Sequence, residues 1–196
     1  MSPFEVPAVE ERVRLVQEVG QVLCKLYEGK AINMIKDAEN SAVKLVNLIT
    51  EKFPGFRDSS IYCGSQVFFY KRAQILVSDL WASHGRDPTF LPDIDALTMF
   101  ADYRVPQILR EKGVLEYSTA LSDMIDREVE IESGSKRESE VRASTVVAVD
   151  DLCDLLKERG NTFKVVECDW VLWQMGEAAL VSGSMRPCHR TRTIFY

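Results

Sequence analysis

The sequence is poor in the side chains that usually bind metal ions. It holds only two histidines, His84 and His189, and its five cysteines stand far apart without a Cys-x-x-Cys pair. Zinc sites and redox pairs are built from closely spaced residues of these types. We therefore expect no metal ion and no cofactor. An odd number of scattered cysteines also predicts reduced, mostly buried thiols rather than a disulfide framework.

Long apolar runs and excess positive charge are also lacking. No hydrophobic stretch approaches the roughly 20 residues that cross a bilayer, and the first residues, Met-Ser-Pro-Phe-Glu, show neither the basic nor the apolar part of a secretory signal. These absences predict a cytoplasmic protein without a membrane partner. Acidic residues outnumber basic ones by 30 to 24, which argues against a broad surface for long nucleic acids.

What is present is the composition of an ordinary globular protein. With 196 residues, of which 46% are hydrophobic and 28% charged, the chain can bury a core as one domain over residues 1–196. A small anionic ligand is compatible with the acidic balance, because it needs only a local basic pocket. Residues 186–192 hold three arginines and one histidine without an acid, a pattern that fits such a pocket and a solvated tail equally well.

Helical spacing of apolar residues dominates the chain. It predicts helices over residues 9–28, 40–53, 105–111, 135–160 and 165–179, and a short helix capped by Ser118. Gly29, Pro54 and Gly160 follow three of them as stop signals. The apolar run 67–81 suits a buried helix, although residues 61–70 also fit a β-hairpin. We expect an all-α fold with at most a small β element around residues 63–69 or 193–196.

Three stretches place charged side chains among aromatic ones, at residues 68–74, 98–107 and 168–173. Burying a charge is costly unless it is paired, so such stretches are either structural ion pairs or functional sites. Asp102 fits both interpretations. Pro106 suits the first turn of a helix that begins near Tyr103, which makes Asp102 a candidate N-cap, and Arg104 or Lys71 are candidate salt-bridge partners. The functional alternative is a carboxylate in a largely dry pocket.

The neighbouring charges and rings leave the same choice open. Lys71 and Arg72 fit a solvated pair at a helix start or a cradle for a phosphate group. Tyr103, Trp170 and Trp173 fit a hydrophobic core or a platform on which a base stacks. Their spacing does not decide between these alternatives.

Longer strings resemble the queuosine-salvage family. They are Phe-Tyr-Lys-Arg-Ala-Gln-Ile-Leu-Val at 69–77, Thr-Met-Phe-Ala-Asp-Tyr-Arg-Val-Pro-Gln at 98–107, Asp169-x3-Trp173, and His-Arg-x-Arg-x-Ile-x-Tyr at 189–196. Glu-Glu-Arg at 10–12 and Glu-Asn-Ser-Ala at 39–42 fit the same family, so the resemblance covers nearly the whole chain. It implies the C-terminal part of the family's protein, whose members carry a further aromatic-rich N-terminal segment that nothing in this chain matches.

The resemblance also carries implications for fold and activity. The family is related to helix-hairpin-helix DNA glycosylases, in which a lysine-bearing helix follows a hairpin and an aspartate lies further along, an order similar to Gly64, Lys71 and Asp102. Its activity is hydrolysis of the N-glycosidic bond of queuosine 5′-phosphate, which releases queuine for tRNA modification. The implied partner is therefore a small nucleotide. Alternatives are a non-catalytic module that binds queuine or its nucleotide without turnover, and a DNA glycosylase.

The resemblance assigns roles to the charged and aromatic residues. Cleavage develops positive charge on the ribose, so a carboxylate facing C1′ stabilises the transition state or attacks it; Asp102 is the catalytic candidate. Asp169 is expected to hydrogen-bond the leaving 7-deazaguanine. Lys71, and after it Arg104 or Arg190, is expected to hold the 5′-phosphate. Tyr70, Tyr103 and Trp170 are candidates for stacking. The full set of expected substrate-binding residues is Tyr70, Lys71, Tyr103, Arg104, Asp169, Trp170 and Arg190.

Overall fold

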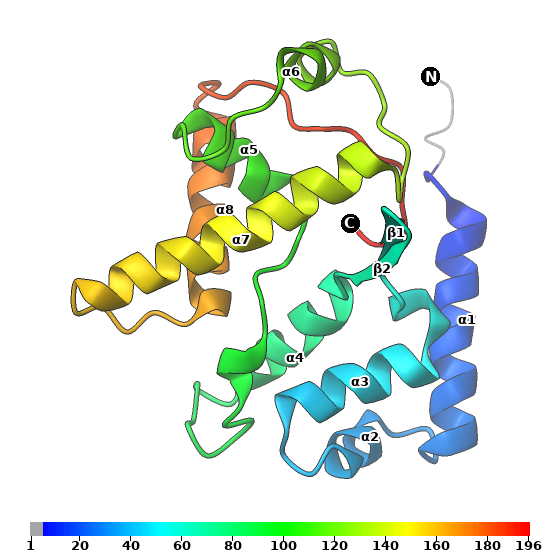
Figure 1. The fold of residues 1–196 in the computed structure, drawn as a ribbon. Coiled ribbons are helices and arrows are strands. Elements are labelled where there is room, and N and C mark those ends of the chain that lie inside the picture. The colour runs from blue at the N-terminus through cyan, green and yellow to red at the C-terminus, as the bar shows by residue number, and fades with distance from the viewer. Residues whose placement is uncertain (1–5) are drawn as a thin grey trace.

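The computed structural model describes residues 6–196, and in that part of the chain it is built from eight α-helices and one small sheet (Figure 1). The first half contains α1 (Val9–Leu26), α2 (Ala31–Asp37), α3 (Ala42–Lys52), the 3-10 helix η1 (Pro54–Phe56), β1 (Ser59–Tyr62), β2 (Ser65–Phe68) and α4 (Lys71–Ser83). The second half contains the 3-10 helix η2 (Ile94–Ala96), α5 (Arg104–Glu111), α6 (Thr119–Asp126), α7 (Lys136–Glu158) and α8 (Val165–Val181). The predicted all-α fold with a small β element is confirmed. None of the helices over residues 6–196 is both long and apolar enough to span a membrane.

Side-chain caps fix several helix starts where the sequence predicts them. Ser41 accepts a hydrogen bond from the N–H of Lys44 at 3.1 Å and thereby caps α3. Ser118 caps α6 and Ser135 caps α7 in the same way. These hydroxyls satisfy N–H groups that have no partner within the helix, so they set the first turn of each helix.

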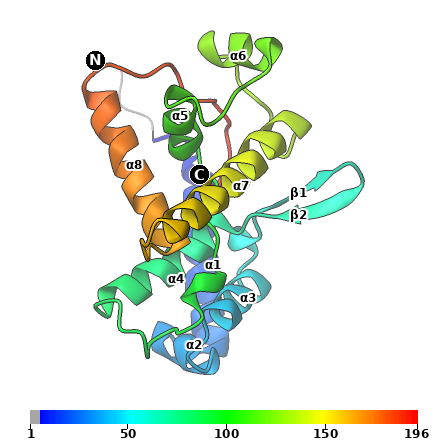
Figure 2. The same ribbon diagram turned by 60° about the vertical axis from the view of Figure 1, so that its left-hand side comes forward.

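The hairpin interpretation of residues 61–70 is confirmed, and the helix predicted over 67–81 begins only at Lys71. β1 pairs antiparallel with β2, with Ser59 opposite Phe68. The turn residues Cys63 and Gly64 both have positive φ, at 49° and 82°, as a two-residue hairpin turn requires. Figure 2 shows the hairpin extending away from the helices. The other expected position, residues 193–196, forms no strand in the described part of the chain.

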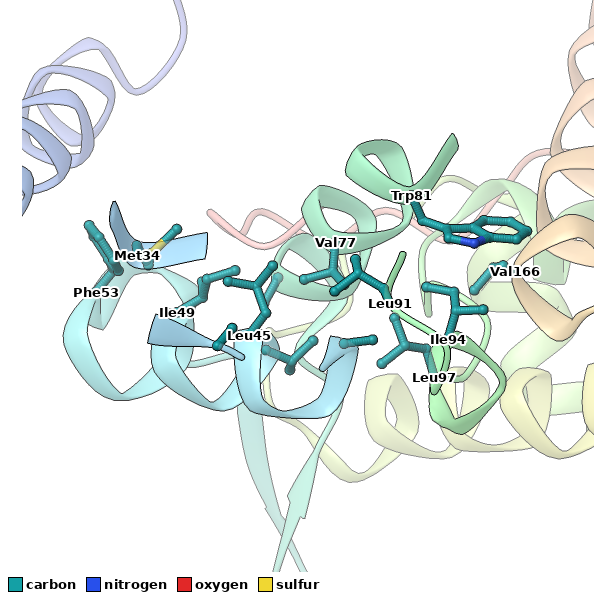
Figure 3. Packing of buried hydrophobic residues seen from close by; sticks show 14 of the residues in the cluster. Met34, Leu45, Ile49, Phe53, Val77, Trp81, Leu91, Ile94, Leu97 and Val166 are labelled. Carbon is teal, nitrogen blue, oxygen red and sulfur yellow. The ribbon is translucent and has the colours of Figure 1, made fainter. Parts of the chain in front are cut away.

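Two hydrophobic clusters form the interior. The first is built mainly by α2, α3 and α4 and contains Leu45, Ile49 and Val77 (Figure 3). The second is built mainly by α5, α7 and α8 and contains Val105, Val149 and Leu172. The segment 97–101 runs between them, because Leu97 and Phe100 belong to the first cluster while Met99 and Ala101 belong to the second. Asp102 follows directly after this shared segment.

The predicted helix at the N-terminal end packs only in part. Val19, Val22 and Leu23 of α1 lie against the first cluster, whereas Val16 is 73% exposed. The helix thus forms where the periodicity predicts it, but no residue of α1 is fully buried.

The expectation of mostly buried thiols is wrong. All five cysteines are free, but Cys24 and Cys63 are exposed, since they lie on α1 and in the hairpin turn. Only Cys153 and Cys168 are buried, in the second cluster between α7 and α8.

Candidate functional site

Asp102 lies between the shared segment and the start of α5. Its side chain is buried, and Oδ1 accepts hydrogen bonds from the N–H groups of Arg104 at 2.9 Å and Val105 at 3.0 Å. The side chain of Asp102 thus caps the first turn of α5 as predicted, although the residue directly before the helix is Tyr103, whose side chain makes no capping hydrogen bond. Oδ2 accepts no hydrogen bond from another residue in the part of the chain that the structure describes. Over residues 6–196, one carboxylate oxygen is therefore held by the backbone and the other has no hydrogen-bond partner.

Asp169 brings a second buried carboxylate to the same place from α8. Its Oδ1 accepts a hydrogen bond from the N–H of Phe100 at 3.0 Å, two residues before Asp102. Burial raises the pKa of Asp169 to about 7, and the negative charge of Asp102 contributes to the rise. Burial also raises the pKa of Asp102, but the N–H group of Val105 and the charge of Lys71 oppose that rise. Burial therefore raises the pKa of both carboxyls, and they differ in that Asp102 accepts two backbone hydrogen bonds and Asp169 accepts one.

Lys71 completes the group as the first residue of α4. Burial lowers the pKa of its ammonium, while the negative charges of Asp102 and Asp169 raise it. Its Nζ makes no hydrogen bond or ion pair with a described residue, whereas its backbone N–H donates to Asp58 Oδ2 at 3.1 Å. Lys71, Asp102 and Asp169 are far apart in sequence, and the fold places them close enough for their charges to act on one another.

A buried ion pair between Asp58 and Arg142 lies next to this group. Arg142, on α7, donates through Nη1 to Asp58 Oδ1 at 2.8 Å and through Nη2 to Asp58 Oδ2 at 2.6 Å. Its Nε donates to the carbonyl oxygen of Ala101 at 3.0 Å. The side chains of Arg142 and Asp58 are 3% and 1% exposed, so the pair is shielded from solvent and from screening by salt.

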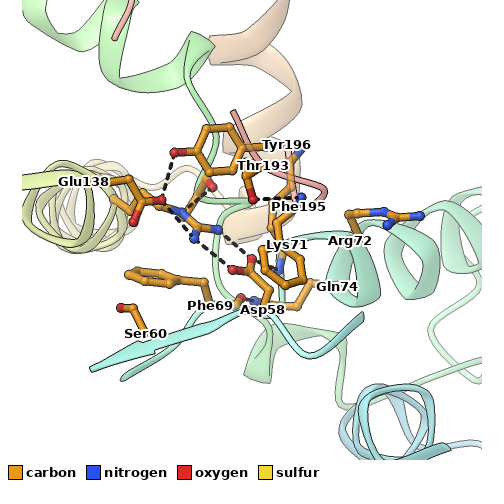
Figure 4. A network of polar contacts seen from close by, with 12 residues as sticks. Asp58, Ser60, Phe69, Lys71, Arg72, Gln74, Glu138, Thr193, Phe195 and Tyr196 are labelled. Atoms are coloured by element: carbon orange, nitrogen blue, oxygen red, sulfur yellow. Dashed lines mark hydrogen bonds and ion pairs between the residues drawn. The ribbon is translucent and has the colours of Figure 1, made fainter. Parts of the chain in front are cut away.

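The last residue of the chain joins this network (Figure 4). The hydroxyl of Tyr196 donates to Glu138 Oε1 at 2.8 Å, and its ring centroid lies 4.8 Å from the Arg142 guanidinium carbon. Nε2 of His189 lies 3.3 Å from the same hydroxyl oxygen. Burial and the charge of Arg142 lower the pKa of His189 to about 4, so the imidazole is neutral at physiological pH.

Two cavities open beside the network, and Tyr196 lines both of them. The first, of about 510 Å³, is lined by Lys71 and Arg72 of α4 and by Arg12 of α1. The second, of about 430 Å³, is lined by Tyr103 and Arg190. The first cavity combines three cationic side chains with the acid Glu11, which gives it the chemistry of a small anion site.

Four of the predicted substrate-binding residues have side chains that contact other parts of the protein, and their binding role stays a prediction. Arg104 donates to Glu177 and Gln107, and Arg190 pairs with Glu128 at the surface. The ring of Trp170 stacks against Trp81 of the first cluster, with centroids 6.4 Å apart. Tyr70 packs beside Phe68 and lines a cavity next to α3. Tyr103 borders the group through the second cavity, where its ring lies 6.5 Å from that of Tyr196.

Comparison with known proteins decides the family. Residues 2–196 match the family described as queuosine salvage protein. The chain belongs to the queuosine salvage protein family. It is 51% identical over 193 residues to the queuosine 5′-phosphate N-glycosylase/hydrolase of Dictyostelium discoideum, a match that covers 98% of this chain and 60% of that relative.

Other curated relatives bear the same name. The protein of Sphaerobacter thermophilus is 47% identical over 98% of this chain and 59% of its own length, and that of Mus musculus is 37% identical over 97% of this chain and 59% of its own length. The chain thus spans about 60% of the length of the curated relatives that it matches.

The buried pair Asp58–Arg142 is a part of this candidate site that sequence reasoning missed. One signal for it exists. Arg142 stands at helical spacing from Thr145 and Val149, both fully buried on the inner face of α7. A charged residue on an otherwise inward face requires a buried partner. Asp58, however, lies 84 residues away in sequence, and nothing local identifies it.

Proposed function

We propose that this queuosine-salvage chain hydrolyses the N-glycosidic bond of queuosine 5′-phosphate and releases queuine. One observation carries the proposal: Lys71 of α4, Asp102 directly after the shared segment and Asp169 of α8 lie close enough for charges within the group to shift the pKa of each member. Perturbed titratable groups gathered in one place are typical of catalytic sites. The relatives named for this hydrolysis share up to 51% of their aligned residues with this chain.

Asp102 acts as the carboxylate that stabilises the ribose. Breaking the N-glycosidic bond leaves positive charge on C1′ and the ring oxygen, and a fixed negative charge nearby lowers the energy of that transition state. The two N–H groups at Oδ1 hold the carboxylate in one orientation and leave Oδ2 to face the sugar. Burial raises the pKa of Asp102, and the N–H groups of Val105 and Arg104 together with the positive charges of Lys71 and Arg104 oppose that rise and favour the ionised form.

Asp169 assists departure of the base. A 7-deazaguanine has no N7 to protonate, so its developing negative charge must be met by hydrogen bonds at other edges. With a pKa of about 7, Asp169 carries a proton in a substantial fraction of molecules at neutral pH and donates it in such a bond. Two carboxylates whose environments differ can thus serve as charge stabiliser and proton donor.

Lys71 binds the 5′-phosphate at the first cavity. Its Nζ is without a partner among the described residues, and Arg72 and Arg12 line the same space. Phosphate binding at a distance from C1′ helps to hold the reacting carbon against Asp102. Arg104 and Arg190 already have acidic partners, and we assign them no contact with the phosphate.

The test is release of free queuine from queuosine 5′-phosphate, measured by mass spectrometry. We expect Asp102→Asn to reduce kcat by about 100- to 1000-fold, the loss typical of removing one electrostatic stabiliser. The matched control is Asp151→Asn, an exposed carboxylate on α7, which should keep the wild-type rate.

Two results would contradict the proposal. One is wild-type kcat in Asp102→Asn or Asp102→Ala. The other is absence of product from the wild type, both alone and when joined to the remaining segment of a relative. Thermal stabilisation by the nucleotide without product would instead identify a binding module that does not turn its ligand over.

A further inference from the structure

One continuous set of hydrogen bonds joins the two backbone positions that present Lys71 and Asp102. The N–H of Lys71 donates to Asp58 Oδ2, both oxygens of Asp58 accept from Arg142, and Arg142 Nε donates to the carbonyl of Ala101, the residue before Asp102. α4 and the shared segment therefore meet at one guanidinium group, which α7 supplies.

Aromatic contacts also orient the guanidinium group of Arg142. Arg142 lies with its terminal carbon 4.0 Å from the ring centroid of Phe69 and 4.8 Å from that of Tyr196, and Figure 4 shows these two rings on either side of the polar network. Contact with both rings restricts the orientation of the guanidinium plane. Because the N–H donors lie in that plane, the directions of their hydrogen bonds are restricted as well. A lysine at this position would keep the charge but lose the fixed fork.

We propose that Arg142 and Asp58 are positioning residues that set the placement of Asp102 relative to Lys71. This inference rests on the proposed hydrolysis, in which the carboxylate must face C1′ while Lys71 holds the phosphate. An ångström of misplacement at a reacting centre costs about 100-fold in rate. Loss of the fork therefore slows the chemical step, although neither side chain touches the substrate.

Arg142→Lys tests this inference against a matched control, Arg110→Lys. Arg110 is also a buried arginine that binds one aspartate through two nitrogens, at Asp126, but it contacts neither Lys71 nor Asp102. We expect both variants to lower Tm, and only Arg142→Lys to lower kcat for queuine release, by about 100-fold, with a much smaller change in KM. Equal kcat values for Arg142→Lys and Arg110→Lys would overturn the inference.

A measurement without substrate separates this inference from the proposed function. In protein labelled with 13C at aspartate side chains, the Asp102 carboxyl resonance and its titration should change in Arg142→Lys and stay as in wild type in Arg110→Lys. An unchanged Asp102 resonance overturns the positioning role even if the wild type releases queuine. A changed resonance supports it even if the wild type is inactive, a result that would contradict only the proposed hydrolysis.

If Arg142→Lys fails to fold, Asp58→Asn provides a second test. Asp58→Asn keeps one oxygen for the N–H of Lys71 or for Arg142 but not the full set of bonds. It should shift the same Asp102 resonance and lower kcat. If Asp58→Asn folds and matches wild type in both measurements, the positioning role is wrong.

Discussion

Replacing Asp169 by asparagine should make the free energy of unfolding less dependent on pH. In the folded protein, burial raises the pKa of this carboxyl from an ordinary 3.8 to about 7. At pH values between these two pKa values, Asp169 is mostly protonated in the folded state and mostly ionised in the unfolded state. The stability linked to Asp169 is therefore fully present below about pH 4 and is lost as pH rises through 7. Because asparagine has no titratable side chain, the variant should not lose this stability as the pH rises.

The magnitude follows from the two pKa values. Asp169 is 4% exposed, so solvent screens its charge little. Between pH 4.5 and 7.5 the wild type should lose roughly 3 kcal/mol from this group alone. The carbonyl oxygen of asparagine can still accept the hydrogen bond from the N–H of Phe100, so the backbone contact survives the change. The variant should thus gain roughly 3 kcal/mol relative to wild type over that range.

Urea unfolding at pH 4.5, 5.5, 6.5 and 7.5 measures this difference. Wild type, Asp169→Asn and the surface control Asp151→Asn are compared at each pH, so that all other titrating groups cancel. The control should follow wild type throughout. A difference between Asp169→Asn and wild type that stays constant over the whole range, or that moves in the opposite direction, would refute the assignment of a raised pKa to this carboxyl.

Two further predictions concern packing and acid stability. A Cβ added at Gly176 of α8 would lie 2.8 Å from Cγ and Cδ of Arg104, so Gly176→Ala should destabilise the protein by about 1–3 kcal/mol. In α1, Gly20→Ala meets no atom within 4 Å and should stabilise by about 0.5–1 kcal/mol; thermal unfolding of both variants checks the contrast. His189, with a pKa lowered to about 4, contributes stability that is present above pH 6.5 and lost as pH falls toward 4. Its 15N resonances should show no titration between pH 5 and 8, and a midpoint near 6.5 would contradict the buried, neutral imidazole.

Local signals in the sequence explain why most of the helices could be predicted. Ser41, Ser118 and Ser135 cap helices through contacts only three residues long, and such contacts follow directly from the order of residues. The seven-residue helix α2 was missed because it is too short to establish a period. The start of α4 was misplaced because apolar β-branched and aromatic residues suit a strand and a buried helix alike.

The candidate site could not be predicted from local signals, because its residues lie far apart in the sequence. Lys71, Asp102 and Asp169 were singled out by resemblance to the queuosine-salvage family, since their spacing fits structural ion pairs equally well. The stacking role expected of Trp170 stays a prediction, and helix geometry explains where its side chain lies. Neighbouring residues on a helix point about 100° apart, so when Asp169 faces the N–H of Phe100 the next side chain is turned toward Trp81.

The shared segment 97–101, which contributes alternately to both hydrophobic clusters, has a consequence for how the protein loses function. Lys71 is anchored beside the first cluster, and Asp102 follows directly from the boundary between the two. A slight loosening of one cluster against the other separates these groups while every helix remains intact. Proteins open in parts at a lower cost than they unfold as a whole. Loss of the proposed hydrolysis would therefore report the fit between the two hydrophobic clusters, and would precede any loss of helix seen by circular dichroism.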